Sequence, residues 1–329
     1  MLIAAGTEIV NNAYDSREEA IDIIDRAEQT VFEISSDNVA AEITGMKELL
    51  QHTFEMLEQA DGREITGIPT GYHRLDDMTC GLHGGEMIIL AARPSMGKTS
   101  LLLNIAEHMG ATEHTPIALF SLEMSKEQLA QRLLASRAEF DLQKMRRGNI
   151  EAEDWTQLQR AAAELENAPI FIDDSPELTV MQLRAKARRL KAAHDIKCVL
   201  VDYLQLMSYH GRAENRQAQV GEMSRGLKAL ARELDIPVIV AAQLNRGPAD
   251  RPSHTPRMSD LRESGSIEQD ADVVTLLHLE DYYHRGEPDY INTNITQLII
   301  AKQRNGPTGI VDLTFIPQCT RFVTAAPAY

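Results

Sequence analysis

Cysteine and aromatic residues are both scarce in this sequence of 329 residues. The three cysteines, Cys80, Cys198 and Cys319, lie far apart and form no CxxC pair. Such an odd and scattered set argues against a disulfide framework and against a zinc site, so we expect reduced thiols. Aromatic residues make up only 5% of the chain, which leaves few rings for stacking on a flat ligand.

Long hydrophobic runs are also missing. With 43% hydrophobic and 25% charged residues the composition is close to the globular average, and no apolar stretch is long enough to cross a bilayer. The first residues, MLIAAGTEIVNNAYDSREEA, have no basic segment ahead of an apolar one, which argues against a secretory signal. We therefore expect a soluble, cytoplasmic protein with no membrane partner.

Positive charge is in deficit, because 33 Lys and Arg face 49 Asp and Glu, for a net charge of -16. A surface with this overall sign repels nucleic acid. Any nucleic-acid site must then be a local basic surface, such as a set of loops that face a channel.

The N-terminal part of the chain predicts helices. Residues 1 to about 34 carry apolar residues at helical spacing, and the stretch MKELLQHTFEMLEQ places Leu50, Phe54 and Leu57 on one face of a short amphipathic helix. A helix of this length is marginal alone in water. Its apolar face is expected to dock either on the same domain or on a neighbouring subunit, and the pattern does not decide between them.

From about residue 66 the pattern changes to that of an α/β fold. Apolar runs such as EMIILAA, PIALFSL, PIFIDD, KCVLVDY and PVIVAAQ alternate with helical patterns, which predicts a mostly parallel sheet covered by helices. Capping-box spacing at Ser125 and Thr179 marks two helix starts. Residues 245–264 predict a mobile loop, and the runs on either side of RNGPTG predict a hairpin.

The stretch EMIILAARPSMGKTSLLLNIAEHM predicts a P-loop, since a buried strand, a tight turn and a helix follow one another. Lys98 can reach the β and γ phosphate oxygens, and Thr99 can hold Mg²⁺. Ala92 stands where the first glycine of the motif is usual. The residues expected to bind the nucleotide are Ser95, Met96, Gly97, Lys98, Thr99 and Ser100.

Three further residues end predicted strands. Asp202 ends KCVLVD, the Walker B pattern, and is a candidate Mg²⁺ ligand. Glu123 ends IALFSLE at the side of the sheet where ligands bind, so it is a candidate catalytic base. Its alternative role is a favourable charge at the start of the next helix. Gln243 ends VIVAAQ, and its amide either senses the γ-phosphate or has no role.

Six stretches then fit one family: ARPSMGKT, FSLEMS, VDYLQLM, AAQLNR, DLRESGSIEQDAD and AKQRNGPTG. Taken in this order they closely resemble the motifs of bacterial and phage replicative DNA helicases of the DnaB family, which also have alanine at the position of Ala92. The resemblance implies a RecA-like P-loop NTPase core over residues 65–329. It also implies that residues 1–35 are the end of a helical N-terminal domain, and that residues 36–64 are a linker with an amphipathic helix.

The resemblance assigns roles to single residues. It makes Glu123 the catalytic glutamate, Asp202 the Walker B aspartate and Gln243 the coupling glutamine. Lys302 and Arg304, near the hairpin turn, become lysine and arginine fingers that reach a neighbouring subunit's ATP, where a cation can stabilise charge on the transferring phosphoryl group. Without the resemblance, these two cations are better explained as solvated charges near a turn.

The same resemblance points to a DNA contact. Arg262, Glu263 and Gly265 match the loop that tracks single-stranded DNA in this family. None of Phe, Trp and Tyr occurs between residues 245 and 265, so we expect backbone contacts rather than base stacking. A ring of such loops concentrates positive charge inside, while the acidic excess lies outside.

The function implied is an ATP-dependent replicative DNA helicase, a homohexamer that uses ATP or another NTP with Mg²⁺ to move along single-stranded DNA. Primase and a helicase loader are the implied partners, in a bacterial cytoplasm or, for a phage protein, that of the host. A RecA-like recombinase or filament ATPase and a non-catalytic NTP switch are the alternatives. Closed rings in electron micrographs separate the first of these from the helicase, and loss of function in Glu123→Gln separates the second.

Overall fold

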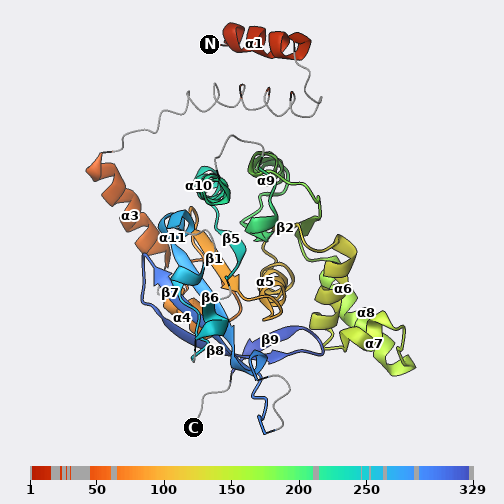
Figure 1. Cartoon of the computed structure of the whole chain (residues 1–329). Coiled ribbons are helices and arrows are strands. Elements are labelled where there is room, and N and C mark those ends of the chain that lie inside the picture. Colours follow the sequence, from red (N-terminus) through yellow and green to blue (C-terminus); the bar gives the residue numbers. More distant parts are fainter. Residues whose placement is uncertain are drawn as a thin grey trace. The chain divides into compact units, whose positions relative to one another are not determined.

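The computed structural model describes residues 2–15, 23, 27, 30, 45–60, 65–209, 215–245, 247–251, 253–261, 265–284 and 289–325. The chain divides into two compact units, Met1–Arg63 and Glu64–Tyr329, and each is described by itself (Figure 1).

The first unit contributes two described helices, α1 (Leu2–Asp15) and α3 (Met46–Ala60). Helix α3 confirms the amphipathic helix predicted for this stretch. Phe54 is 63% exposed and Leu50 is 50% exposed, so part of the apolar face of α3 is uncovered in the single chain. Most of the helical pattern expected up to residue 34 falls outside the described residues.

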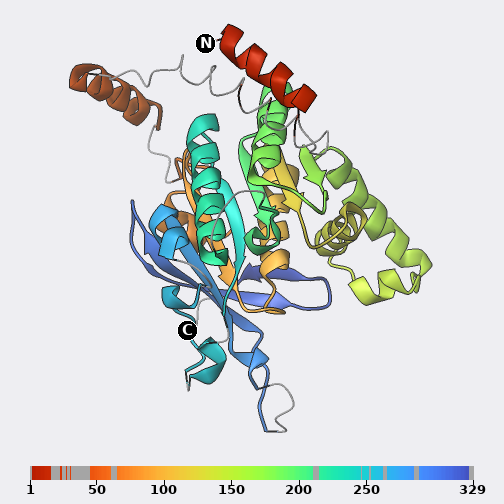
Figure 2. The same cartoon turned by 45° about the horizontal axis from the view of Figure 1, so that its top comes forward.

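The second unit is built on a nine-stranded sheet in the order β3-β2-β4-β5-β1-β6-β7-β8-β9 (Figures 1 and 2). Its strands are β1 (Met87–Ala92), β2 (Ile117–Ser121), β3 (Ile170–Asp173), β4 (Cys198–Asp202), β5 (Val238–Gln243), β6 (Val273–Leu279), β7 (Ile295–Gln303), β8 (Gly309–Ile316) and β9 (Arg321–Thr324). Strands β3 to β6 in that order pair in parallel. Strands β7, β8 and β9 continue the sheet in antiparallel fashion. The predicted α/β class, parallel core and terminal hairpin are therefore confirmed.

The central strands are apolar on both faces because helices cover both. In β1, Ile88 and Leu90 belong to one core and Ile89 and Ala91 to the other. Helix α5 (Lys98–Glu107) packs into the first core. Helices α9 (Val180–His194) and α10 (Arg216–Leu234) pack into the second. Because these strands are parallel, their carboxyl ends lie together at one end of the sheet, where the P-loop begins.

The remaining helices of this unit come before β1 or between strands. They are α4 (His73–Thr79), α6 (Lys126–Arg137), α7 (Leu142–Arg146), α8 (Ala152–Glu166) and α11 (Gly265–Asp270), with a π-helical turn at His108–Thr112 and 3-10 turns at Leu204–Leu206, Gly247–Asp250, Met258–Asp260 and Glu280–Tyr282. Both predicted capping boxes form, at Ser125 with Gln128 and at Thr179 with Gln182. No helix in the described part of the chain is long and apolar enough to cross a bilayer.

Two details differ from the sequence expectation. The strand before Glu123 ends earlier, at Ser121, so Glu123 lies in the bend beyond it. Within residues 247–251 and 253–261, the segment after β5 forms two 3-10 turns and specific contacts that the loop pattern did not predict. The two terminal nitrogens of the Arg251 guanidinium, Nη1 and Nη2, donate to the carboxylate of Asp260 at 2.7 and 2.5 Å, and Leu244 forms a β-bridge with Leu261. Long-range contacts of this kind do not follow from a Pro- and Ser-rich pattern.

Candidate nucleotide-binding and active site

The turn between β1 and α5 has the backbone conformation of a phosphate-binding loop. Ser95 and Gly97 have positive φ angles of 66° and 91°. A Cβ on Gly97 would come within 2.7 Å of the Phe322 ring, so glycine is required there both by conformation and by space. Among the described residues no side chain caps the first turn of α5, which leaves its backbone N–H groups directed at the loop.

Lys98 and Thr99 both contact Asp202 at the end of β4. The Lys98 ammonium is 3.0 Å from one carboxylate oxygen, and the Thr99 hydroxyl donates to the other at 2.6 Å. The Lys98 ammonium also lies 3.7 Å from the centre of the Tyr203 ring. Asp202 is 1% exposed, so its charge needs these partners. A hydroxyl and a carboxylate held this closely are the hard oxygen ligands that Mg²⁺ takes, which makes the pair a fitting site for that ion.

Glu123 lies beside this cluster. Ser121 and Asp202 are register partners, and the Leu122 N–H donates to the Asp202 carbonyl at 2.7 Å. The charges of Glu123 and Asp202 contribute, after burial, to raising the pKa of Tyr203. The start of α6 is capped by Ser125, so Glu123 is not needed to cap it. Glu123 is exposed at this end of the sheet, and its role as the catalytic base stays a prediction.

Gln243 is the register partner of Ala92, the last residue before the P-loop turn. A residue that the sequence did not single out, Gln205, bonds the backbone of Gln243 twice. The Gln243 N–H donates to Gln205 Oε1 at 3.1 Å, and Gln205 Nε2 donates to the Gln243 carbonyl at 3.3 Å. Gln205 therefore ties the turn after β4 to the end of β5. Its place in VDYLQLM, three residues after Asp202, is the one sequence feature that could have drawn attention to it.

Arg132 on α6 is a second residue that sequence reasoning missed. Burial and the charge of Arg146 lower the pKa of its guanidinium, whereas Asp202 and Glu123 act in the opposite direction. Arg132 is therefore a half-buried cation within the electrostatic reach of both carboxylates. No local motif marks it, because its position depends on how α6 packs.

Lys302 and Arg304 lie elsewhere. The Lys302 ammonium donates to the carbonyls of Glu268 and Ala271 at 2.6 and 2.7 Å, and the Arg304 guanidinium donates to the carbonyl of Gln269 at 2.7 Å. Burial and the charge of Arg304 lower the pKa of Lys302. Both cations thus bind the carboxyl end of α11, where exposed carbonyls favour positive charge. In the single chain they are not simply solvated, as the alternative interpretation supposed.

The strand register separates these cations from the P-loop of the same chain. Lys302 pairs with Val274, and Val274 pairs with Ile89 in the first half of β1. The P-loop follows Ala92 at the other end of that strand. Three residues of strand span about 10 Å, so each chain carries its P-loop and these two cations towards opposite ends of β1.

Comparison with known proteins agrees with this architecture. The family of the DnaB-like helicase C terminal domain matches residues 67–324. The chain belongs to the DnaB-like helicase family. It is 47% identical to the replicative DNA helicase DnaB of Geobacillus stearothermophilus over 327 residues, which cover 98% of this chain and 71% of that protein. It is 45% identical to the replicative DNA helicase DnaC of Bacillus subtilis strain 168 over 325 residues, with shares of 98% and 71%.

Two solved structures of this DnaB-like group are similar. One is a separate ATPase domain, which superimposes with a TM-score of 0.81 at 38% identity, over 87% of this chain and all of that one. The other is a DnaB-like replicative helicase, solved in a study of its interactions with primase, which gives a TM-score of 0.84 at 36% identity over 98% of this chain and 75% of that one. The predicted family, the RecA-like fold and the ATP-dependent DNA helicase activity are confirmed. Use of a nucleotide follows from that activity.

The residues expected to touch DNA are only partly described in this DnaB-like chain. Arg262 and Glu263 fall outside the described residues. Gly265 is exposed and begins α11, and among the described residues no atom lies within 4 Å of the position that a Cβ would take. The helix that follows the expected DNA loop is therefore the same helix that binds Lys302 and Arg304 at its other end. The assignment of these residues to DNA stays a prediction.

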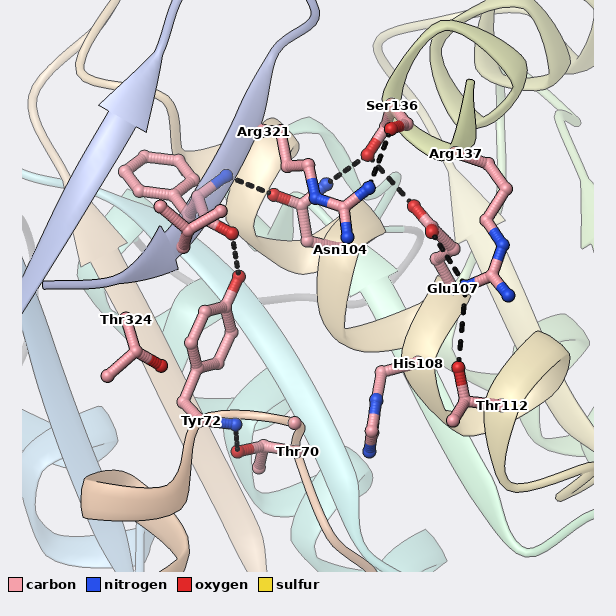
Figure 3. Close-up of a pocket in the computed structure, with 13 residues that line it drawn as sticks. Thr70, Tyr72, Asn104, Glu107, His108, Thr112, Ser136, Arg137, Arg321 and Thr324 are labelled. Carbon is pink, nitrogen blue, oxygen red and sulfur yellow. Dashed lines mark hydrogen bonds and ion pairs between the residues drawn. The ribbon is translucent and has the colours of Figure 1, made fainter. Parts of the chain in front are cut away.

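A cavity of about 230 Å³ lies at the far end of α5 from Lys98 (Figure 3). Its polar groups bond one another. The Phe322 N–H donates to Asn104, Asn104 donates to Ser136, and Ser136 donates to Glu107. Within the described part of the chain, none of the predicted site residues lines it. This network anchors the P-loop helix to β9 and α6.

Proposed function

We propose that this chain is one subunit of a homohexameric ring that hydrolyses ATP with Mg²⁺ and moves along single-stranded DNA. The observation that supports this most is the separation of the P-loop from Lys302 and Arg304 within a chain. Since a phosphoryl-transfer site needs both a phosphate-binding loop and cations for the transition state, a complete site requires two neighbouring chains.

One subunit binds and prepares the nucleotide. The backbone N–H groups from Ser95 to Ser100 hold the phosphates, with Met96 contributing only its backbone because its side chain is buried, and Lys98 exchanges its contact with Asp202 for one with the β and γ oxygens. Mg²⁺ supplies charge neutralisation at those oxygens, and Thr99 with Asp202 holds it. Glu123 orients the attacking water and accepts its proton.

The neighbouring subunit completes the site. Lys302 and Arg304 leave the carbonyls of their own α11 and contact the γ-phosphate across the interface. Their charge stabilises the transition state more than the ground state. Removal of such a cation from a phosphoryl-transfer site lowers turnover by about 10³-fold or more.

DNA is held by the loop that precedes α11. Arg262, Glu263 and Gly265 contact the phosphate backbone, chiefly through backbone N–H groups and one guanidinium per subunit. Gln243, next to the P-loop, relays the state of the γ-phosphate to the segment that leads to this loop. Contact with the sugar-phosphate backbone alone gives binding that is independent of sequence.

Primase is proposed as a partner because one similar solved structure concerns a DnaB-like replicative helicase and its interactions with primase. A helicase loader is proposed on the family relationship. The exposed apolar face of α3, which includes Leu50 and Phe54, is an interaction surface that a ring neighbour can cover.

Subunit mixing tests the shared site. A Lys98→Ala chain keeps its fingers, and a Lys302→Ala/Arg304→Ala chain keeps its P-loop, so each alone should lose DNA-stimulated ATP hydrolysis. In equimolar mixed hexamers about a quarter of the interfaces pair an intact P-loop with intact fingers, so activity should partly return. The matched control is Arg160→Ala, which removes an exposed cation on α8 and should change nothing.

Two outcomes would contradict the proposal. One is full ATP hydrolysis by the Lys302→Ala/Arg304→Ala chain, and the other is no recovery on mixing. Electron micrographs of the wild-type chain with an ATP analogue and single-stranded DNA supply the separate test of the assembly, since open filaments instead of closed rings would favour a recombinase-like protein.

A further inference from the structure

Outside the nucleotide site, three histidines surround a single carboxylate. Glu280 lies just after β6 in the turn Glu280–Tyr282, with His278 on β6 before it and His284 four residues after it. His254 reaches the same carboxylate from the segment between β5 and α11. The cluster joins two segments that are 26 residues apart in the chain.

The cluster has the geometry of a metal-ligand set. His254 Nδ1 and His284 Nε2 are each 3.1 Å from Glu280 Oε1. One ligand atom from each of His254, Glu280 and His284 lies within 4.8 Å of the other two. Separations near 3 Å are those between neighbouring ligands of an ion bound at about 2.0–2.1 Å to each in a tetrahedral arrangement.

The surrounding side chains fix the orientation of these three. The His254 ring stacks on Tyr283 with centroids 4.1 Å apart and 8° between planes, and the His284 ring stacks on Tyr290 at 4.4 Å and 15°. Buried His278 holds the second carboxylate oxygen of Glu280 at 2.9 Å. Outer groups that orient the ligating rings and carboxylate are the usual companions of a metal site.

We propose that His254 Nδ1, His284 Nε2 and Glu280 Oε1 bind a divalent transition-metal ion, with Zn²⁺ as the best match. Two imidazoles and one carboxylate suit Zn²⁺ and its neighbours in the first transition row, whereas Mg²⁺ and Ca²⁺ take oxygen ligands. At least one position stays open for water. The site contains no cysteine, which is why the cysteine count gave no indication of it.

The ion would join the segment after β5 to the segment after β6. The first of these segments is already closed by the Arg251–Asp260 ion pair, and it leads to α11. Metal binding adds a second attachment point at His254, so the bound ion should stabilise the conformation of this segment. The inference stands on the described cluster alone and does not require the proposed ring or its DNA contact.

Zinc titration of the whole chain tests the site. The protein is treated with a chelator and carries Cys80→Ser, because an exposed thiol can also bind zinc. Calorimetry with zinc chloride, without nucleotide or Mg²⁺, should give one ion per chain. Cobalt chloride in place of zinc should give the visible absorption bands of a low-symmetry four- or five-coordinate Co²⁺ complex.

Variants locate the bound ion. His254→Ala and His284→Ala should each weaken zinc binding by more than about 100-fold, and His278→Ala, which acts through Glu280, by about 10- to 100-fold. His73→Ala removes an exposed histidine at the start of α4 and should leave binding unchanged. Circular dichroism shows whether each variant is folded.

Trypsin digestion gives a readout that is independent of affinity. Zinc should slow cleavage after Arg257 in the wild-type chain and have no effect in His254→Ala. The proposal is overturned by the absence of a one-to-one complex, or by zinc binding that survives both His254→Ala and His284→Ala. In either case the cluster is a hydrogen-bonded group of histidines around Glu280 and nothing more.

Discussion

Glu107 is a buried carboxylate, 5% exposed, in the middle of the network that anchors α5 (Figure 3). Burial raises the pKa of its carboxyl, while the Ser136 hydroxyl, Arg321 and Arg137 act to lower it. The net effect is a folded-state pKa above the ordinary value of 4.5. The protonated acid is therefore the form that folding favours, in spite of two arginines nearby.

This shift predicts a pH-dependent stability. A raised acid pKa contributes stability that is fully present below the unfolded value of 4.5 and is lost as the pH rises through the folded pKa. Glutamine does not titrate, so Glu107→Gln does not lose this stability as the pH rises. The unfolding free energy of the variant minus that of the wild type should therefore increase as the pH rises from 4.5. Urea unfolding at several pH values measures this. Glu166→Gln, at an exposed site on α8, should show no such trend.

Individual site residues differ in how far the sequence predicts them. Lys98 and Thr99 belong to a local strand, turn and helix pattern, and Asp202 ends a recognisable apolar strand, so one stretch of sequence suffices for each. Arg132 and Gln205 join the same site only because α6 and the turn after β4 pack beside it. Such neighbours depend on tertiary contacts that no local pattern encodes.

The turn that begins α5 combines two constraints in one element. Gly97 has a φ of 91°, and the Phe322 ring fills the space where a Cβ would lie. Phe322 is on β9, so the short last strand supports the phosphate-binding turn. The P-loop conformation is therefore stabilised by a residue from the far end of the sequence.

Two glycine substitutions separate these constraints. Gly148 has a φ of 68° with nothing within 4 Å of its missing Cβ, so Gly148→Ala should cost only the backbone term, about 1 kcal/mol. Gly97→Ala adds the contact with Phe322 and should cost about 2–3 kcal/mol or more, with loss of nucleotide binding. Thermal unfolding and nucleotide titration measure the two effects. An equal loss of stability in both variants would show that the Phe322 ring moves aside at no cost.

At the scale of elements the sequence predicts the regular parts of the fold. Strands β1 to β5, the two capping boxes and the hairpin of β7 and β8 all follow from periodicity and turn chemistry. Strand β9 was missed because its four residues, RFVT, are too few to show alternation. The contacts of the segment after β5 were also missed. They are the Arg251–Asp260 ion pair and the contact of His254 with Glu280, and no sequence motif marks these residues as partners.

The whole molecule has a net charge of -16, so DNA must be held by local positive charge against an unfavourable overall field. Binding of this kind depends steeply on salt, because each phosphate contact releases bound counterions. The predicted loop supplies one guanidinium per subunit at Arg262.

Salt titration tests the loop. Arg262→Ala should weaken single-stranded DNA binding to all sequences equally and reduce the slope of log affinity against log salt by about 0.7 for each phosphate that the guanidinium no longer neutralises. Fluorescence anisotropy with labelled oligonucleotides at several salt concentrations measures both. Arg160→Ala, which removes the same charge on α8, is the control. An unchanged slope for Arg262→Ala would remove this residue from the DNA contact.

The P-loop lies at one end of β1, and Lys302 and Arg304 lie towards the other end. This placement has a consequence for chains that are not assembled with a neighbour. A chain that is diluted away from its neighbours keeps a loop that can hold ATP but has nothing to complete the reaction, while its own two cations rest on α11. Separate chains of the proposed ring should therefore not hydrolyse ATP. Catalysis is expected to begin only when neighbouring chains have assembled.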